Sequence, residues 1–236
     1  MQFDINFMFT AIKESIKYTP VTLILAFVPF IAGIFFGSII ALVRLYKIRV
    51  FDRVFQVYIV ITKGVPVMLQ ILIVYYFVFQ TYKGVAEKFH LSLQAKEIEL
   101  IYIALLALFI YGTAGISESI RGALISINKG QYESGYSVGM TRSQTLRRII
   151  IPQALPIAVP MLCSNLIGLV KSSSLVLMIS VVDLMNAALI PANTSYKYLE
   201  AYVAAAIVYW IINIGIEKTS LLIESRLSVY RKEGVL

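Results

Sequence analysis

Charged residues are scarce in this chain. Asp, Glu, Lys and Arg make up 14% of its 236 residues and hydrophobic residues make up 59%, whereas a soluble domain carries about 25% charged residues. A soluble fold of this composition would have too little polar side chain to cover its surface. The composition therefore argues against a soluble globular protein.

Cysteine and histidine are nearly absent. The single cysteine, Cys163, excludes a disulfide within the chain, and its place in an apolar run predicts a packing role. The single histidine, His90, falls in a predicted outer loop, and no metal-spaced His/Cys cluster or catalytic triad occurs. The phosphate-binding loop Gly-x-x-x-x-Gly-Lys-Ser/Thr is also missing. We therefore expect no enzymatic activity, no metal and no cofactor in this chain.

Five apolar runs dominate the sequence instead. A bilayer core of about 30 Å needs about 20 apolar residues per helix, and each run reaches that length when its flanks are included. The runs occupy residues 21–42, 57–79, 101–116, 154–170 and 202–216. They predict an all-α membrane protein with five transmembrane helices.

The placement of charge predicts the orientation. The formal net charge is +8, and every arginine lies in the first connection, the third connection or the C-terminal tail. The second connection, residues 80–99, offsets its lysines with glutamates. Because basic connections face the cytoplasm, we expect the N-terminus outside and the C-terminus in the cytoplasm, although Lys13 and Lys17 disagree. The basic groups orient the protein, and we expect no nucleic-acid partner.

We expect three regions. Residues 1–18 place apolar side chains among polar ones, which fits a helix in the outer membrane interface and equally a frayed end. Residues 19–226 form the transmembrane domain, and residues 227–236 form a cytoplasmic tail.

The first two runs contain unusual small residues. Gly33, Gly37 and Ala41 recur every four residues, which favours close packing against another helix of this chain or of a second copy. In the second run, Gly64 and Pro66 break or kink the helix and release backbone groups that need partners. Gln70 lies one turn further on and is placed to serve them. The break fits the lining of a cavity, and it also fits a simple packing kink.

A polar, arginine-rich insert follows the third run. Gly130 and Gly139 bracket a predicted helix of about two turns, with Gly139 as its left-handed C-terminal cap. Glu133 is expected in the first turn, where a carboxylate opposes the helix dipole. Thr141 and Gln144 have the capping-box spacing of a second helix. An insert of this kind is typical of a docking surface for a soluble partner.

Charge and proline flank the insert. Glu118 and Arg121, at the end of the third run, are spaced i, i+3 and are predicted to form an ion pair. Pro152 and Pro156 enter the fourth run and are predicted to bend its first turns.

The fourth run is interrupted by Lys171, which three serines follow. A lysine in lipid costs about 2.5–3.5 kcal/mol, so we expect it to face protein or water. The serines predict the N-cap of a new half-helix over residues 175–185, and a helix broken near the midplane presents its positive end to an anionic group. Alternatively, Lys171 lies near the outer membrane surface, and its side chain extends so that the amine reaches the water there.

These pieces together resemble a known family. Glu133-Ser134-Gly135, Gly139 and Ile149-x-Ile151-Pro152 resemble the cytoplasmic E-A-A…G…I-x-L-P motif of binding-protein-dependent ABC importer permeases. The resemblance covers about residues 18–226, and the pieces similar to the polar amino acid branch are Lys63–Gln70 with Tyr75-Tyr76, Ser117–Gly122, Lys129–Gln131, Arg147–Leu155 and Lys171–Leu175.

The chain departs from that family at a few positions. Ser134 and Gly135 stand at the two alanines of the motif, and Ile151 stands at its last leucine. Lys63 and Val65 replace the usual arginine and threonine of the branch, and Ser172 replaces an acidic or amide residue.

The resemblance implies a type I ABC importer permease fold with a cytoplasmic coupling helix between the third and fourth spans. It implies a multi-pass protein of the bacterial cytoplasmic (inner) membrane that pairs with a second permease subunit, identical or homologous. Two ATPases, which bind ATP and Mg, would receive the coupling helix, and an extracytoplasmic binding protein would deliver a polar amino acid or a derivative such as cystine. The implied ATPase-coupling residues are Glu133, Ser134, Gly135, Gly139, Ile149, Ile151 and Pro152.

Candidates for the substrate pathway are the polar or helix-breaking residues of the second, third and fourth runs: Thr62, Gly64, Pro66, Gln70, Glu118, Lys171, Ser172, Ser173 and Ser174. An alternative is a secondary transporter or channel that works without ATP. That alternative explains Lys171 and the kinks, but it gives the polar insert no role.

Overall fold

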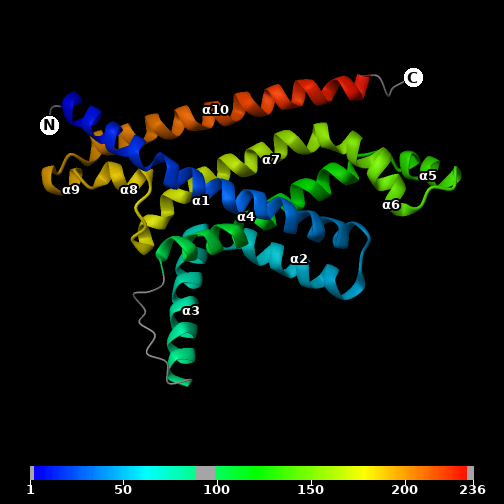
Figure 1. Cartoon of the computed structure of the whole chain (residues 1–236), viewed down its shortest axis with the longest axis horizontal. Helices are drawn as coiled ribbons and strands as arrows, with labels where there is room; N and C mark the ends of the chain where they lie inside the picture. Colours follow the sequence, from blue (N-terminus) through cyan, green and yellow to red (C-terminus); the bar gives the residue numbers. More distant parts are fainter. Residues whose placement is uncertain (1–2, 89–98, 233–236) are drawn as a thin grey trace.

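The computed structural model describes residues 3–88 and 99–232, and within these ranges the regular structure is helical (Figure 1). His90 lies outside the described residues. The α-helices are α1 Ile5–Leu45, α2 Arg49–Gly64, α3 Val67–Lys88, α4 Leu100–Ile125, α5 Lys129–Ser137, α6 Arg142–Thr145, α7 Ile151–Ser173, α8 Leu184–Leu189, α9 Ala192–Ser195 and α10 Tyr198–Lys232. A π-helical segment, Leu146–Ile150, precedes α7, and a 3₁₀ helix, Ser174–Ile179, follows it.

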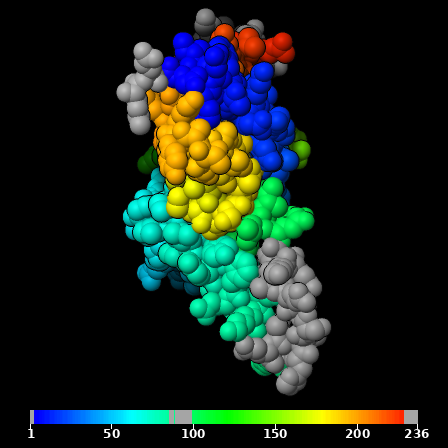
Figure 2. Space-filling model, turned by 90° about the vertical axis from the view of Figure 1, so that its left-hand side faces the viewer, coloured from blue at the N-terminus to red at the C-terminus, as the bar shows by residue number. Residues whose placement is uncertain are grey.

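Four long helices lie side by side and define the long axis of the molecule. Helices α1, α4, α7 and α10 run along that axis, with α5 and α6 at one end and α8 and α9 at the other (Figure 1). Seen from the latter end, the surface of α8 and α9 lies between the start of α1 and α3 (Figure 2). The C-terminal part of α10 lies toward the end that carries α5 and α6.

Four helical segments are long and apolar enough to cross a membrane: Ile5–Leu45, Leu100–Ile125, Arg142–Ile179 and Tyr198–Leu227. A fifth crossing is reached if α2 and α3, between which the chain bends by 114°, count as one broken span. The four or five candidate spans include the five that the sequence predicted, and the predicted break in the second span lies between Gly64 and Val67. Residues 5–18 are the first turns of α1, continuous with the first span and not a separate element.

The ladder of small residues packs within the chain. A Cβ added at Gly33 would come within 2.7 Å of Ile116 Cδ1, and one at Gly37 within 3.1 Å of the Ser117 backbone nitrogen. Both glycines are buried. The ladder therefore allows α1 to approach α4, which selects the intramolecular reading.

The core joins α1, α3, α4, α7 and the 3₁₀ helix, and includes Leu25, Ile71, Leu108, Leu169 and Val176. By contrast, many large apolar side chains lie on the outside, among them Phe35, Phe77 and Trp210. A folded chain with so much exposed apolar surface is suited to a lipid or protein environment.

The three serines after Lys171 do not cap a new helix. Helix α7 continues through Ser173, and the hydroxyls of Ser173 and Ser174 donate back to the carbonyls of Val170 and Lys171 at 2.9 and 2.7 Å. The predicted half-helix over residues 175–185 was therefore wrong, because a hydroxyl can bond to the preceding turn as well as cap the next one. The next α-helix, α8, is capped by Asp183, whose carboxylate accepts from the Asn186 N–H at 3.0 Å.

Candidate functional site

Helix α5 forms the core of the polar insert. Its N-cap is Asn128, whose side chain accepts from the Gly130 N–H at 2.8 Å. Its C-terminal end has the predicted left-handed glycine, Gly139 with φ +81°, and the Met140 N–H donates to the Gly135 carbonyl at 3.0 Å. The Met140 bond and the left-handed Gly139 together end the helix in a Schellman motif. The prediction for Glu133 was wrong in detail, because the helix begins at Lys129 and Glu133 lies beyond its first turn.

Helix α6 begins with the predicted capping box. The Thr141 hydroxyl accepts from the Gln144 N–H at 3.3 Å, and the Gln144 side chain accepts from the Thr141 N–H at 2.8 Å. Thr145 follows, fully buried against Gly135 of α5. The two short helices therefore form one unit, the α5–α6 lobe (residues 128–145), at the end of the bundle (Figure 1).

The lobe is anchored to the bundle by residues that the motif does not include. Ile150 is fully buried in a cluster with Ala123, Leu124 and Ala154, whereas Ile151 is 37% exposed. The Tyr132 hydroxyl donates to the Leu124 carbonyl at 3.1 Å. Pro152 is the second residue of α7 and directly follows the π-helical segment Leu146–Ile150. Sequence reasoning missed Ile150 because the motif names its neighbours, Ile149 and Ile151.

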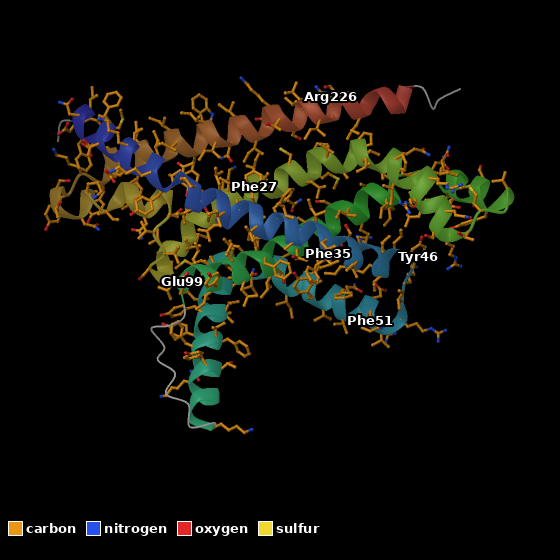
Figure 3. All side chains as sticks on the ribbon, in the orientation of Figure 1. Phe27, Phe35, Tyr46, Phe51, Glu99 and Arg226 are labelled. Atoms are coloured by element: carbon orange, nitrogen blue, oxygen red, sulfur yellow. The ribbon has the colours of Figure 1, made fainter. Side chains whose placement is uncertain are left out.

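The outer surface of the lobe is exposed. Glu133 and Ser134 are exposed, and so are the apolar groups of Tyr136 (42%) and Val138 (76%). This mixed polar and apolar surface, on a structured pair of helices, is suited to a protein partner. Tyr46, at the turn between α1 and α2, lies toward the same end of the molecule, and Glu99 lies toward the other (Figure 3).

An ionic cluster joins α1, α2 and α4. Arg121 donates from Nε and Nη2 to the two carboxylate oxygens of Glu118, at 3.0 Å each, which confirms the predicted pair. Arg44 also donates to Glu118, and its Nε lies 3.8 Å from Asp52 Oδ1. The sequence pattern gave no sign of the contributions of Arg44 and Asp52, because both come from other helices.

The break between α2 and α3 is closed by Gln70. Its side-chain amide donates to the carbonyls of Thr62 and Val65, both at 2.7 Å. These are carbonyls that the chain releases where Pro66 interrupts the helix, so Gln70 has the role that its position predicted. Gly64 and Pro66 are exposed at the bend.

A cavity of about 350 Å³ lies between α2, α4 and α7. It brings together two of the predicted pathway residues, Thr62 and Glu118. Its wall also contains polar residues that the predictions did not include: Lys63, Ser119, Ser164 and Asn165. The amide of Asn165 donates to the Ser119 hydroxyl at 2.7 Å, and the Asn165 Oδ1 lies so close to Gly115 that a Cβ added there would clash with it.

Lys171 and Ser174 line a different hollow. This groove of about 580 Å³ lies where α7, α8 and α10 meet, and it also includes Trp210, Asn213 and Glu217. Ser172 and Ser173 are buried. The pathway candidates therefore divide between the bend, the cavity, the groove and the interior, and do not form a single site.

A third polar cluster lies at the opposite end from the lobe. Asp4 caps α1 by accepting from the Phe7 N–H at 3.0 Å, and the Lys197 amine donates to its other carboxylate oxygen at 2.5 Å. The Lys197 hydrogen bond, together with the Phe7 N–H, holds the pKa of Asp4 below its usual 3.8. Because the Asp4 N–H donates to Glu200 at 3.0 Å, this cluster ties the start of α1 to the start of α10.

Comparison with known proteins identifies the class. The fold has four or five candidate membrane spans, and the chain matches, over residues 33–229, the family described as "Binding-protein-dependent transport system inner membrane component". The chain belongs to this family and lies in the inner membrane.

Individual relatives are similar in sequence to this chain over most of its length. The chain is 31% identical over 228 residues to the probable amino-acid ABC transporter permease protein PatM of Vibrio harveyi, covering 97% of this chain and 98% of the relative. It is 34% identical over 210 residues to the L-cystine transport system permease protein TcyB of Bacillus subtilis (strain 168), covering 89% and 84%.

Solved structures share the fold. A chain from the crystal structure of an amino acid ABC transporter with histidines superimposes with a TM-score of 0.79 at 29% identity, covering 96% of this chain and 100% of the other. A chain of the MetNI methionine ABC transporter in an inward-facing conformation gives 0.68 at 17% identity, covering 95% and 99%. The second match shows the likeness of fold alone.

Proposed function

We propose that this chain is the membrane-spanning permease subunit of an ATP-driven importer for polar amino acids or a close derivative such as cystine. The observation that carries the proposal is the α5–α6 lobe, an ordered pair of helices with an exposed outer surface at one end of a membrane bundle. The relatives named for amino-acid and L-cystine transport support the substrate class.

The lobe is the surface that receives energy from outside the chain. In this proposal, two partner ATPases bind ATP and Mg and receive the lobe in a groove. Glu133, Ser134 and Gly139 face the ATPase or shape α5, whereas Ile149, Ile151 and Pro152 lie on the connection to α7. Movement of the lobe is transmitted through buried Ile150 to α4 and α7.

The basic residues at the end that carries the lobe predict the orientation in the membrane. The lobe with Arg142, the adjoining Arg147 and Arg148, the basic α1–α2 turn and the C-terminal part of α10 lie at one end. That end is therefore cytoplasmic by the positive-inside rule. The N-terminus and the Asp4 cluster then lie on the outer side, where an extracytoplasmic binding protein delivers the substrate. Residues 19–226 form the transmembrane domain.

The pathway lies along the face formed by α2, α4, α7 and α10. Thr62 and Glu118 contribute to it from the cavity, and Lys171 and Ser174 from the groove on the neighbouring side of α7. Gln70, Gly64 and Pro66 hold the bend of the second span at this face. A second permease subunit, identical or homologous, encloses the pathway.

Co-expression with an ATPase encoded beside this gene tests the proposal. We expect a stable complex that drives amino acid uptake in proteoliposomes containing the binding protein, and we expect Glu133→Lys and Gly139→Asp to abolish uptake. Intact uptake in both variants, or uptake driven by an ion gradient without ATP, would overturn the proposal.

A further inference from the structure

A groove of about 670 Å³, here called the apolar groove, lies between α1, α7 and α10. Two polar members of its wall are bonded to backbone. The Thr219 hydroxyl donates to the Gly215 carbonyl at 2.8 Å, and the Cys163 thiol lies 3.9 Å from the Ile216 carbonyl. The rest of the wall is mainly hydrocarbon and includes Phe27 and Phe30 of α1, Leu162 and Leu166 of α7, and Ile212 and Ile223 of α10.

The apolar groove has the length of one membrane leaflet. Its lining on α10 extends from Ile212 to Ile223, and a rise of about 1.5 Å per residue makes that distance about 16 Å. The hydrocarbon core of a bilayer is about 30 Å thick, so one leaflet contributes about 15 Å. These α10 residues all belong to the candidate span Tyr198–Leu227. The groove therefore matches the depth of an acyl chain in one leaflet.

Gly215 gives the apolar groove part of its space. It is exposed in the middle of α10, and nothing lies within 4 Å of a Cβ added there. A glycine inside a helix weakens that helix, and at Gly33 and Gly37 the reason for it is the close approach of α4. No such approach occurs at Gly215, so the glycine leaves open space in the wall instead.

Arg226 lies beyond the groove at the end that carries the α5–α6 lobe. The groove face of α10 includes Ile216, Thr219 and Ile223. Arg226 follows Ile223 by three residues and continues this face. It is exposed near the end of the candidate span, and it lies further toward the lobe than Phe27 (Figure 3). Among the side chains that the structure describes, none forms an ion pair with Arg226, so its guanidinium is available to an anion at the membrane surface.

We propose that the apolar groove binds an anionic phospholipid, with one acyl chain in the groove and the phosphate-bearing headgroup on Arg226. The apolar wall matches the chain in length and chemistry, and the cation at its end matches the headgroup, because a guanidinium binds phosphate oxygens in pairs. A zwitterionic headgroup carries its own ammonium and is attracted less. The proposal needs only the place of the chain in the membrane, and it is independent of the transported substrate.

Photo-cross-linking of the intact transporter in nanodiscs tests this site. The nanodiscs consist of phosphatidylcholine with a trace of photoreactive lipid, either phosphatidylglycerol or phosphatidylcholine, that carries a diazirine in the middle of one acyl chain. We expect phosphatidylglycerol to label the groove peptides of α7 and α10 about fivefold more than phosphatidylcholine does. Arg226→Gln should lower the phosphatidylglycerol labelling to the phosphatidylcholine level, and Arg226→Lys should retain most of it. Gly215→Phe fills the groove and should remove the labelling by both lipids.

Two control variants lie on α10 outside the apolar groove. Lys218→Gln removes another exposed cation, and Ile211→Phe adds bulk at another exposed position. Neither residue lines the groove, so both variants should be labelled as wild type is.

Equal labelling of wild type by the two lipids, phosphatidylglycerol labelling that Arg226→Gln leaves unchanged, or labelling that persists in Gly215→Phe would overturn the proposal. Cross-linking of Cys163 between two copies of this chain by a bismaleimide would show that a second subunit covers the groove, and it would overturn the proposal as well. Labelling is measured on the peptides of this chain, so the result does not depend on ATP-driven uptake.

Discussion

Gly135 of α5 and Thr145 of α6 lie in direct contact, with no room for another atom between the two helices. A Cβ added at Gly135 would come within 2.6 Å of Thr145 Cγ2 and 2.7 Å of its Oγ1. Both residues are buried, and the Thr145 hydroxyl donates to the Thr141 carbonyl at 3.1 Å. This contact sets the spacing of the α5–α6 lobe, at a position where the related motif carries alanine.

Gly135→Ala is therefore expected to weaken coupling, although it restores the residue of the motif. Alanine gains up to about 1 kcal/mol of helix propensity, but overpacking of this contact costs about 1–3 kcal/mol, so the clash should win. ATP-driven uptake should fall several-fold, and adding Thr145→Ala should restore it by making room. Ser143→Ala, at an exposed residue of α6 outside the coupling motif, is the control. Full activity of Gly135→Ala alone would show that the spacing of the helices is not critical.

Substitutions at Gly139 test the backbone geometry of the same lobe, because a side chain added there would clash with no other atom. Its φ is +81°, and nothing lies within 4 Å of an added Cβ. Gly139→Ala should therefore destabilise the end of α5 by about 1–2 kcal/mol through backbone strain alone, while Gly139→Asn should be milder because asparagine tolerates this conformation. The melting temperature of the permease–ATPase complex measures both. Equal losses in the two variants would point to a side-chain effect instead.

Gln70 holds the break between α2 and α3. Gln70→Leu removes the donor to the Thr62 and Val65 carbonyls, and leaving such groups unsatisfied costs about 1–3 kcal/mol. We expect a lower melting temperature and reduced uptake. Gln80→Leu removes an exposed amide from the same helix and should have little effect. If the two variants behave alike, the Gln70 hydrogen bonds do not hold the bend.

The Asp4–Lys197 pair predicts a pH dependence at the outer end. Because hydrogen bonds from Lys197 and the Phe7 N–H lower the pKa of Asp4 in the folded state, the pair stabilises the fold above the unfolded pKa of about 4. That contribution is lost as the pH falls through the lower, folded pKa. Asp4→Asn keeps the cap and removes the charge.

The melting temperatures of wild type and Asp4→Asn are to be compared from about pH 7 down to about pH 3. The difference should stay constant near neutral pH and shrink below about pH 4. A difference that is absent at neutral pH, or that grows on acidification, would show that the pair does not stabilise the fold.

Local patterns in the sequence were sufficient for the features that depend on neighbouring residues. The left-handed Gly139, the capping box of Thr141 and the pair of Glu118 with Arg121 all follow from spacings of a few residues, and the structure confirms them. Gln70 was predicted correctly for the same reason, since its partners lie within eight residues of it.

Features that depend on tertiary contacts were missed. Arg44 reaches Glu118 across 74 residues of sequence, and the cavity combines α2, α4 and α7. Neither can be read from one segment. The error at Ser172–Ser174 has a local cause, because serine is compatible with both a helix interior and an N-cap, and packing against α3 and α8 decides which one forms.

Cysteine labelling and cross-linking at Ser134 test the central claim, that the α5–α6 lobe is the cytoplasmic contact of a partner ATPase. In a Cys163→Ala background, Ser134→Cys should react with a membrane-impermeant maleimide only in inverted vesicles and should cross-link to the ATPase. Thr194→Cys, exposed on α9 at the opposite end, should react only in right-side-out vesicles and form no cross-link. Labelling of Ser134→Cys from the outside, or no cross-link to an ATPase that supports uptake, would contradict the account.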